Sequence, residues 1–358
     1  MSLLFSPLTL KSITLKNRIA LSPMCQYQSL DGHPGDWQLM HLGARAAGGA
    51  GLIMTEATSV APEGRISPWD AGLWKDSQIE PWKKIFSFVK SFGAIPAVQL
   101  AHAGRKASAD YPWKGGRSLS AEEGGWETLS PTATAFGGHL QKVPHAMTIA
   151  EITRLIEDFG SSAQRALKAG AELVEIHAGH GYLLHEFLSP LTNHRSDEYG
   201  GSFENRIRIL IECVKSVKRN WPDELPLIVR LSTTDWSETG WQLSESVELA
   251  KILKELKVDL IDSSSGFVAP SPTPYPVGPN WQVELAATIR READILTGAV
   301  GMISKGVQAE EILQKEQADL VFIGREFLRQ PYWPIIAAKE LGVDVTSVGN
   351  LSISHWIK

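Results

Sequence analysis

Two histidines three residues apart are the first side chains whose types and spacing suggest chemistry. They belong to the stretch HAGHGY, His177 to Tyr182, which has a glycine on each side of the second histidine and ends in a tyrosine. His185 and His194 follow, so four of the ten histidines lie between residues 177 and 194. Such a cluster is compatible with a metal site, with an acid/base pair or with a turn that has no chemistry.

A metal site would need three or four ligands, for example His177 and His180 with Glu186 or His194. An H-x-x-H pair without a second pair of ligands is weak evidence for one. We therefore expect no metal and keep the acid/base and structural alternatives open.

Composition limits the kind of protein that carries these residues. The chain has 358 residues, 43% hydrophobic and 21% charged, which is typical of a globular protein with a large core. Its net charge is -5, and it has no basic run of the kind that binds nucleic acid or a membrane surface. No segment approaches the roughly 20 apolar residues of a membrane span, and the N-terminus does not resemble a leader peptide. We expect a cytoplasmic enzyme.

The chain has only two cysteines, Cys25 and Cys213. A disulfide framework and a structural zinc site of thiolates are therefore not expected. Cys213 lies in a segment with helical periodicity, where core packing is its expected role.

Eight short apolar runs that end in small or polar residues predict the strands of a (β/α)8 TIM barrel. They cover residues 18–24, 51–57, 94–102, 173–179, 226–232, 260–266, 294–301 and 320–326. Amphipathic spacers such as 156–170, 203–221 and 244–256 predict the intervening helices. A doubly wound open sheet is the rival fold, but its glycine-rich nucleotide turn is missing after the first strand, which ends in SPMCQY.

Between the third and fourth strands the spacing is interrupted by an insertion, residues 104–144, that is rich in Gly, Pro and Trp. Long loops at the mouth of a barrel often cover a site, so we expect a lid here. No boundary of a second domain is visible, and residues 1–358 are predicted to form one domain.

Reactive residues of barrel enzymes collect where strands end. The candidates at these positions are Ser22, Pro23, Met24, Cys25, Tyr27, Glu56, Ala57, Gln99, His102, Glu175, His177, His180, Tyr182, Arg230, Gly298, Gly301, Gly324 and Arg325.

The last two strands predict a phosphate site. TGAVGM and FIGRE bring glycines, whose backbone N–H groups can approach a phosphate closely, to the region where barrels often bind one. Arg230, inside the strand LIVRLS, needs a partner that offsets its desolvation. A carboxylate or a ligand would serve equally, and with a flavin the guanidinium could stabilise charge near N1 and O2.

Five segments together resemble the Old Yellow Enzyme family of FMN-dependent ene-reductases, closest to its thermophilic-like and xenobiotic reductase branch. They are LKNRIALSPMCQY (15–27), GLIMTEATSVAPEGRIS (51–67), QLAHAGRKA (99–107), EIHAGHGYLLHEFLSPLTNHRSDEYGGSFENR (175–206) and DLVFIGREFLRQP (319–331). The resemblance covers nearly the whole chain and implies FMN at the C-terminal mouth of the barrel.

The resemblance also implies roles for the candidates. Ser22, Pro23, Met24, Cys25, Ala57 and Gln99 would line the flavin ring, Arg230 would contact its N1/O2 side, and Gly298, Gly301, Gly324 and Arg325 would hold the phosphate. His177 and His180 match a pair that hydrogen-bonds the carbonyl oxygen of an α,β-unsaturated substrate, and Tyr182 matches the proposed proton donor. The implied cycle is ping-pong, with NADPH or NADH as the reductant and an enone or a nitro compound as the oxidant. His185 and His194 would be bystanders.

Three further positions carry expectations with open alternatives. Cys25 would lie near the flavin and tune it, or be an inert buried thiol, and Tyr27 would cap the substrate pocket or only pack. The C-terminus ends HWIK, so Trp356 would enter the substrate site of a neighbouring subunit or pack on its own barrel. A homodimer or homotetramer is expected. The alternatives to an ene-reductase are a demethylase or dienoyl-thioester reductase on the same scaffold, a metal-dependent hydrolase, and a flavin-binding protein without catalysis.

Overall fold

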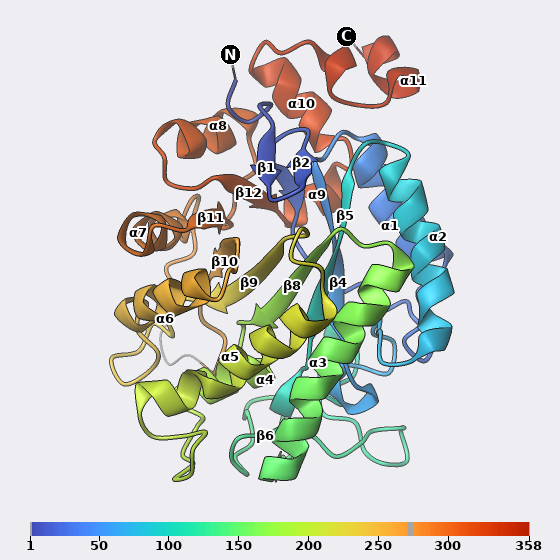
Figure 1. Cartoon of the computed structure of the whole chain (residues 1–358). Helices are drawn as coiled ribbons and strands as arrows, with labels where there is room; N and C mark the ends of the chain where they lie inside the picture. Colours follow the sequence, from blue (N-terminus) through green and yellow to red (C-terminus); the bar gives the residue numbers. More distant parts are fainter. Residues whose placement is uncertain (1, 271–274, 358) are drawn as a thin grey trace.

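The computed structural model describes residues 2–270 and 275–357 and contains a closed parallel barrel (Figure 1). Around the barrel the strands follow the order β10, β11, β12, β3, β4, β5, β8 and β9. Their bounds are β3 Ile19–Leu21, β4 Leu52–Ser59, β5 Ile95–Ala101, β8 Leu173–Ala178, β9 Leu227–Ser232, β10 Leu260–Ser264, β11 Leu296–Ala299 and β12 Leu320–Ile323. All eight strands lie within or overlap the apolar runs of the sequence, so the predicted barrel is confirmed.

Helices surround this barrel. Their bounds are α1 Asp36–Ala47, α2 Ile79–Lys90, α3 Ile149–Ala169, α4 Leu183–Leu188, α5 Phe203–Asn220, α6 Leu243–Glu255, α7 Val283–Ala293, α8 Gly306–Gln314, α9 Arg325–Arg329, α10 Trp333–Glu340 and α11 Leu351–Ser354. The three amphipathic spacers predicted as helices correspond to α3, α5 and α6. No helix of the described residues is long and apolar enough to cross a membrane.

The start of α3 shows how local sequence sets an element. The Thr148 side chain accepts a hydrogen bond from the Glu151 N–H, and the Glu151 carboxylate accepts one from the Thr148 N–H. This capping box satisfies two N–H groups that the helix itself leaves unpaired. At the other end Gly170 adopts φ 89°, a left-handed conformation in which glycine avoids the steric cost of a side chain.

Two layers of apolar side chains hold the barrel. Inside it, residues such as Leu52, Leu173 and Phe322 pack on the hairpin of β1 (Leu8–Leu10) and β2 (Ile13–Leu15), which closes one end. Outside it, the strands pack on the apolar faces of the helices, where Cys213 is fully buried on α5, in agreement with its predicted packing role.

The insertion between β5 and α3 lies at the end opposite this hairpin. It contains the short helices η3 (Gly104–Lys106) and η4 (Pro112–Lys114) and the strands β6 (Leu129–Ser130) and β7 (His145–Ala146). In Figure 1 the insertion lies at the bottom, below the C-terminal ends of the barrel strands, and both chain termini lie at the top.

Candidate active site

Strand register brings the predicted residues to one end of the barrel. His177 of β8 is paired with Arg230 of β9, and Arg230 is paired in turn with Asp262 of β10. On the other side, Gln99 of β5 is paired with Ala57 of β4 and with Glu175 of β8. The register therefore makes two neighbouring groups of side chains out of residues that are far apart in sequence.

Arg230 has a carboxylate partner, which resolves one alternative left open by the sequence. Its Nε lies 3.2 Å from Asp262 Oδ2, both side chains are almost fully buried, and its Nη1 donates to Ser22 Oγ at 3.3 Å. The Nε–H does not point at the carboxylate oxygen, so the pair is a charge contact rather than an aligned hydrogen bond.

A second buried carboxyl adjoins this pair. Glu175 accepts a hydrogen bond from Gln99 Nε2 at 2.7 Å and is fully buried. Burial, and then the charge of Asp262, raise the pKa of Glu175 well above its ordinary value, although Arg230 opposes this. Burial also raises the pKa of Asp262 to about 6. Burial therefore disfavours the charged form of both carboxyl groups beside Arg230.

A cavity of about 430 Å³ opens beside Arg230. Its lining includes six of the predicted cofactor and substrate residues together with side chains that the sequence did not single out. They are Met24, His180, Arg230, Ser264, Phe267, Trp281, Gln282, Val300, Gly301, Met302, Ile303, Ser304, Phe322, Gly324, Arg325, Glu326 and Arg329. A volume of this size suits a cofactor or a drug-sized ligand.

The glycines at the far end of this cavity fit a phosphate-bearing ligand. A Cβ on Gly324 would meet nothing closer than Met24 Sδ at 3.8 Å and would occupy open space. Arg325 and Arg329 lie one helical turn apart on the same wall. Gly298 differs from this group, because it lies inside β11, where the ring of Phe322 would be 2.4 Å from an added Cβ. Close packing therefore accounts for Gly298.

The HAGHGY stretch forms the end of β8 and a turn before α4. His177 is buried in the strand, His180 and Gly181 have positive φ, and Tyr182 is the residue before the helix. His177 Nδ1 accepts the Gly179 N–H at 3.3 Å, so the proton of a neutral ring is on Nε2. This Nε2 lies 3.3 Å from His180 Nδ1, while His180 Nε2 lies 2.7 Å from Ser264 Oγ.

All three reactive side chains of the stretch are neutral at neutral pH. Burial, and then the charge of Arg230, hold the pKa values of His177 and His180 well below the ordinary histidine value. Burial raises the pKa of the Tyr182 hydroxyl, and the nearby carboxylate of Asp70 adds to this. The histidines can thus act as uncharged hydrogen-bond donors and the tyrosine as a protonated phenol.

Comparison with known proteins decides the family. The model of the NADH:flavin oxidoreductase / NADH oxidase family matches residues 3–343. The chain belongs to this family. It is an FMN-dependent NADPH oxidoreductase, and its predicted resemblance to the Old Yellow Enzymes is confirmed.

Individual relatives agree with this assignment. The chain is 48% identical to an NADPH dehydrogenase of Halalkalibacterium halodurans over 96% of both chains, and 47% identical to one of Geobacillus sp. over 97% of this chain and 96% of the other. The structure of morphinone reductase in complex with tetrahydroNAD superposes with a TM-score of 0.78 at 29% identity, covering 95% of this chain and 90% of that one. An old yellow enzyme homologue from Zymomonas mobilis gives 0.75 at 29% identity, over 92% and 90%.

A second cavity, of about 420 Å³ and called the mouth from here on, shares the lining residue Phe267 with the first. The insertion lines it with Pro112 and Phe136, and Tyr182 and Phe267 line it from the barrel. Lys106 belongs to the same lining, and burial lowers the pKa of its amine to about 7. The HAGHGY turn therefore stands between two cavities, with His180 facing one and Tyr182 the other.

Two residues near the first strand lie close to this mouth. Cys25 is half-buried, and burial, with the charges of Asp70 and Glu56, raises the pKa of its thiol, so it is neutral. The ring of Tyr27 makes edge contacts with Tyr111 and Trp113 of the lid, at centroid distances of 6.3 and 5.7 Å.

Trp356 is not brought to the site of its own chain. It is 82% exposed, and the C-terminal helices lie at the end of the barrel opposite the lid (Figure 1). The alternative in which this side chain packs on its own barrel is thus not supported.

Metal ligands do not assemble here either. Among residues 2–270 and 275–357, no three His, Cys, Asp or Glu side chains are grouped so that they could hold an ion. His194 is exposed, and His185 is engaged elsewhere in the core.

The sequence analysis missed Arg329, Lys106, Ser264 and Gln282. Arg329 had a detectable signal, because it lies four residues after Arg325 and hence on the same face of a helix. Lys106 belongs to the segment QLAHAGRKA, whose resemblance to the family gave a signal for it.

Proposed function

We propose that the enzyme reduces activated C=C bonds of α,β-unsaturated carbonyl compounds in a ping-pong cycle, and that it can also act on nitro compounds. The observation that carries this proposal is the HAGHGY turn. It presents two neutral histidines, with facing nitrogens 3.3 Å apart, and a neutral tyrosine between the cofactor cavity and the mouth.

The residues of the cofactor cavity would bind FMN, which when bound accepts hydride from NADPH and delivers it to an alkene. Arg230 would lie against the N1/O2 side of the ring, with Ser22 to Cys25, Ala57 and Gln99 around it. Because Asp262 already offsets part of its charge, Arg230 can stay charged in the core while stabilising negative charge on a ligand. Gly301, Gly324, Arg325 and Arg329 would hold the phosphate.

His177 and His180 would hold the carbonyl oxygen of the alkene. The Nε2–H of His177 is on the side of the ring that faces His180, and a carbonyl oxygen lying beside the two facing nitrogens, within hydrogen-bond distance of both, would accept it. His180 supplies a second donor when the Ser264 hydroxyl, which also lies 3.2 Å from Gln282 Oε1, turns to donate to His180 Nε2, because the ring proton is then on Nδ1. Two aimed donors stabilise the negative charge that develops on this oxygen as hydride reaches the β-carbon.

Tyr182 would then protonate the α-carbon. A phenol is a poor acid in water, but a strongly basic enolate close to it makes the transfer favourable. The ring centroid of Tyr182 lies 5.2 Å from that of His177, so the proposed proton donor is adjacent to one of the histidines that would hold the carbonyl oxygen.

The remaining assignments complete the proposal. The insertion 104–144 would act as a lid whose aromatic side chains, with Tyr27, enclose the substrate, and Cys25 would touch the flavin side of the pocket. Trp356, exposed and remote from its own site, would reach the pocket of a neighbouring subunit in a cytoplasmic homodimer or homotetramer.

Absorption spectroscopy of purified protein tests the proposal. Flavin bands should bleach with NADPH under anaerobic conditions and return when cyclohexenone is added. His177→Ala and His180→Ala should each reduce enone turnover by about 10²-fold, the usual cost of one oxyanion donor, and weaken phenol binding while FMN stays bound. His194→Ala, which changes an exposed histidine of the same region, is the control. Unaltered turnover in both active-site variants would refute the carbonyl clamp.

A further inference from the structure

The backbone of the HAGHGY turn is held in an unusual conformation. His180 and Gly181 are consecutive residues in the left-handed region, with φ values of 55° and 68°. A non-glycine residue such as His180 reaches this region only at a steric cost, so the surrounding contacts must stabilise it.

Side chains from other elements bind the polar groups of this backbone. The His180 N–H donates to Ser232 Oγ at 2.7 Å, and the His180 carbonyl accepts from Lys106 Nζ at 2.7 Å. The Gly181 N–H donates to His185 Nδ1 at 2.9 Å. The direction of the next residue, Tyr182, therefore depends on His185.

His185 is itself fixed by a buried carboxylate. Its Nε2 lies 3.0 Å from Asp235 Oδ1, and both side chains are fully buried. Because Nδ1 accepts the Gly181 N–H, the proton of the neutral ring is on Nε2, next to Asp235. The N–H is not well aligned with Oδ1, so this contact orients the ring mainly through charge and dipole.

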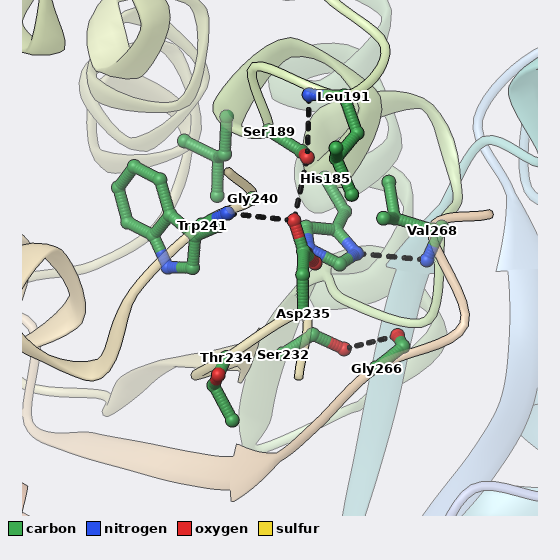
Figure 2. Close-up of polar contacts among 12 residues, drawn as sticks. His185, Ser189, Leu191, Ser232, Thr234, Asp235, Gly240, Trp241, Gly266 and Val268 are labelled. Atoms are coloured by element: carbon green, nitrogen blue, oxygen red, sulfur yellow. Dashed lines mark hydrogen bonds and ion pairs between the residues drawn. The ribbon is translucent and has the colours of Figure 1, made fainter. Parts of the chain in front are cut away.

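Asp235 is anchored on its other oxygen. Oδ2 accepts the Ser189 hydroxyl at 2.6 Å and the Trp241 N–H at 2.7 Å, and Figure 2 shows the carboxylate between these groups and the ring of His185. Burial alone would raise the pKa of Asp235, but His185, Ser189 and Trp241 together hold it below its ordinary value. The carboxylate therefore joins the end of α4, the β9–α6 loop and the HAGHGY turn.

We infer that His185, oriented by Asp235, is a positioning residue for alkene reduction. It lines neither of the two cavities described above. Its Nδ1 holds the Gly181 N–H, and thereby aims His180 and Tyr182 at the carbonyl oxygen and the α-carbon of the substrate. This inference rests on the proposed ene-reductase function, and it replaces the expectation that His185 is a bystander.

Two substitutions separate positioning from packing. In His185→Asn the amide oxygen occupies the place of Nδ1 and can still accept the Gly181 N–H, although the contact with Asp235 is lost. In His185→Gln the amide can reach Asp235, but no acceptor remains for Gly181. If His185 only fills space, the turn and the turnover should be affected to a similar extent in both variants. If His185 positions the turn, His185→Asn should be closer to the wild type than His185→Gln.

Hydrogen exchange of the holoenzyme measures the turn directly. In His185→Gln, amides of a peptide covering residues 178–184 should exchange faster than in the wild type, and kcat/KM for cyclohexenone should fall by about 10²-fold, the cost of a misplacement of about 1 Å. His185→Asn should restore most of both quantities. FMN content reports folding, and His194→Gln is the matched control at an exposed histidine.

If His185→Gln does not fold, Asp235→Asn provides the same test. An asparagine there must point its NH2 group either at the Trp241 N–H or at His185. In the second case the ring proton moves to Nδ1 and opposes the Gly181 N–H. Faster exchange of the 178–184 peptide is again expected.

The outcomes are distinguishable. Equal exchange and turnover in the Gln and Asn variants of His185, or wild-type values in His185→Gln, would overturn the positioning role. Wild-type turnover in His180→Ala, measured in parallel, would overturn the proposed function, while the exchange data would still show whether His185 holds the turn.

Discussion

Replacing Arg230 by methionine tests the electrostatic design of the site. The guanidinium lies 3.2 Å from Asp262, in a region where both side chains are buried and where burial, with the charge of Asp262, raises the pKa of Glu175. Methionine fills much of the same volume but removes the charge. Asp262 must then either stay ionised without its cation or take up a proton.

The loss of folding stability caused by Arg230→Met depends on pH in a defined direction. In the wild type the pKa of Asp262 is raised from 3.8 to about 6, so this group contributes about 3 kcal/mol of stability below pH 4 that is lost as pH rises to 6. Without Arg230 the folded-state pKa rises further, and the loss continues above pH 6. Breaking a buried pair costs about 3–5 kcal/mol, so this penalty should be present at pH 8 and largely absent at pH 5.

A double-mutant cycle with Arg230→Met and Asp262→Asn isolates the interaction free energy between the two side chains. Urea unfolding at pH 5 and pH 8 gives the coupling energy, in which changes of FMN affinity caused by the arginine alone cancel. We expect a coupling of about 2–3 kcal/mol at pH 8 that falls toward zero at pH 5, where Asp262 is mostly protonated. The same coupling at both pH values, or none at pH 8, would show that the pair is not an electrostatic unit.

Three further substitutions probe separate parts of the site. Gly181→Ala places a Cβ 2.1 Å from the Phe267 carbonyl oxygen at a residue with φ 68°, so we expect a loss of about 2–5 kcal/mol in the free energy of unfolding, measured by urea titration. Arg325→Ala and Arg329→Ala should each weaken FMN binding, measured by fluorescence titration, with a smaller effect at high salt; unchanged affinity in both would move the phosphate elsewhere. Tyr182→Phe should lower enone turnover by about 10²-fold in steady-state assays but leave phenol binding intact.

The sequence predicted the barrel well because a parallel barrel repeats one local signal. Each strand is a short apolar run buried on both faces, and each one ends where reactive residues can face the mouth. The same signal predicted that Gln99, His177 and Arg230 lie at one end of the barrel. The lengths of the strands were less predictable: β3 covers only Ile19–Leu21, because the chain leaves the sheet at Ser22 and does not continue to Met24.

The contacts that the sequence could not predict are those made across strands by side chains outside the motifs. Asp235 is 50 residues from His185, and only the pairing of β8 with β9 brings their loops together. The contact of His185 with Gly181 was more accessible, since four residues separate them at the start of a helix. The sequence nevertheless indicated only a bystander at His185, because a histidine that accepts a backbone N–H has no distinguishing pattern in sequence.

The arrangement of charge is consistent with the proposed cycle, in which one turn would serve two ligands in succession. Arg230 brings positive charge to the cofactor cavity, while the neutral His177 and His180 add hydrogen-bond donors without adding charge. A cationic histidine pair would attract negative charge before hydride transfer and hold an enolate too tightly afterwards. Neutral donors fixed by buried partners instead offer their stabilisation mainly when charge develops, which is the condition for lowering a barrier rather than only binding a substrate. The fixed partners, Ser232, Lys106 and His185, are therefore as much a part of the proposed chemistry as the donors that they hold.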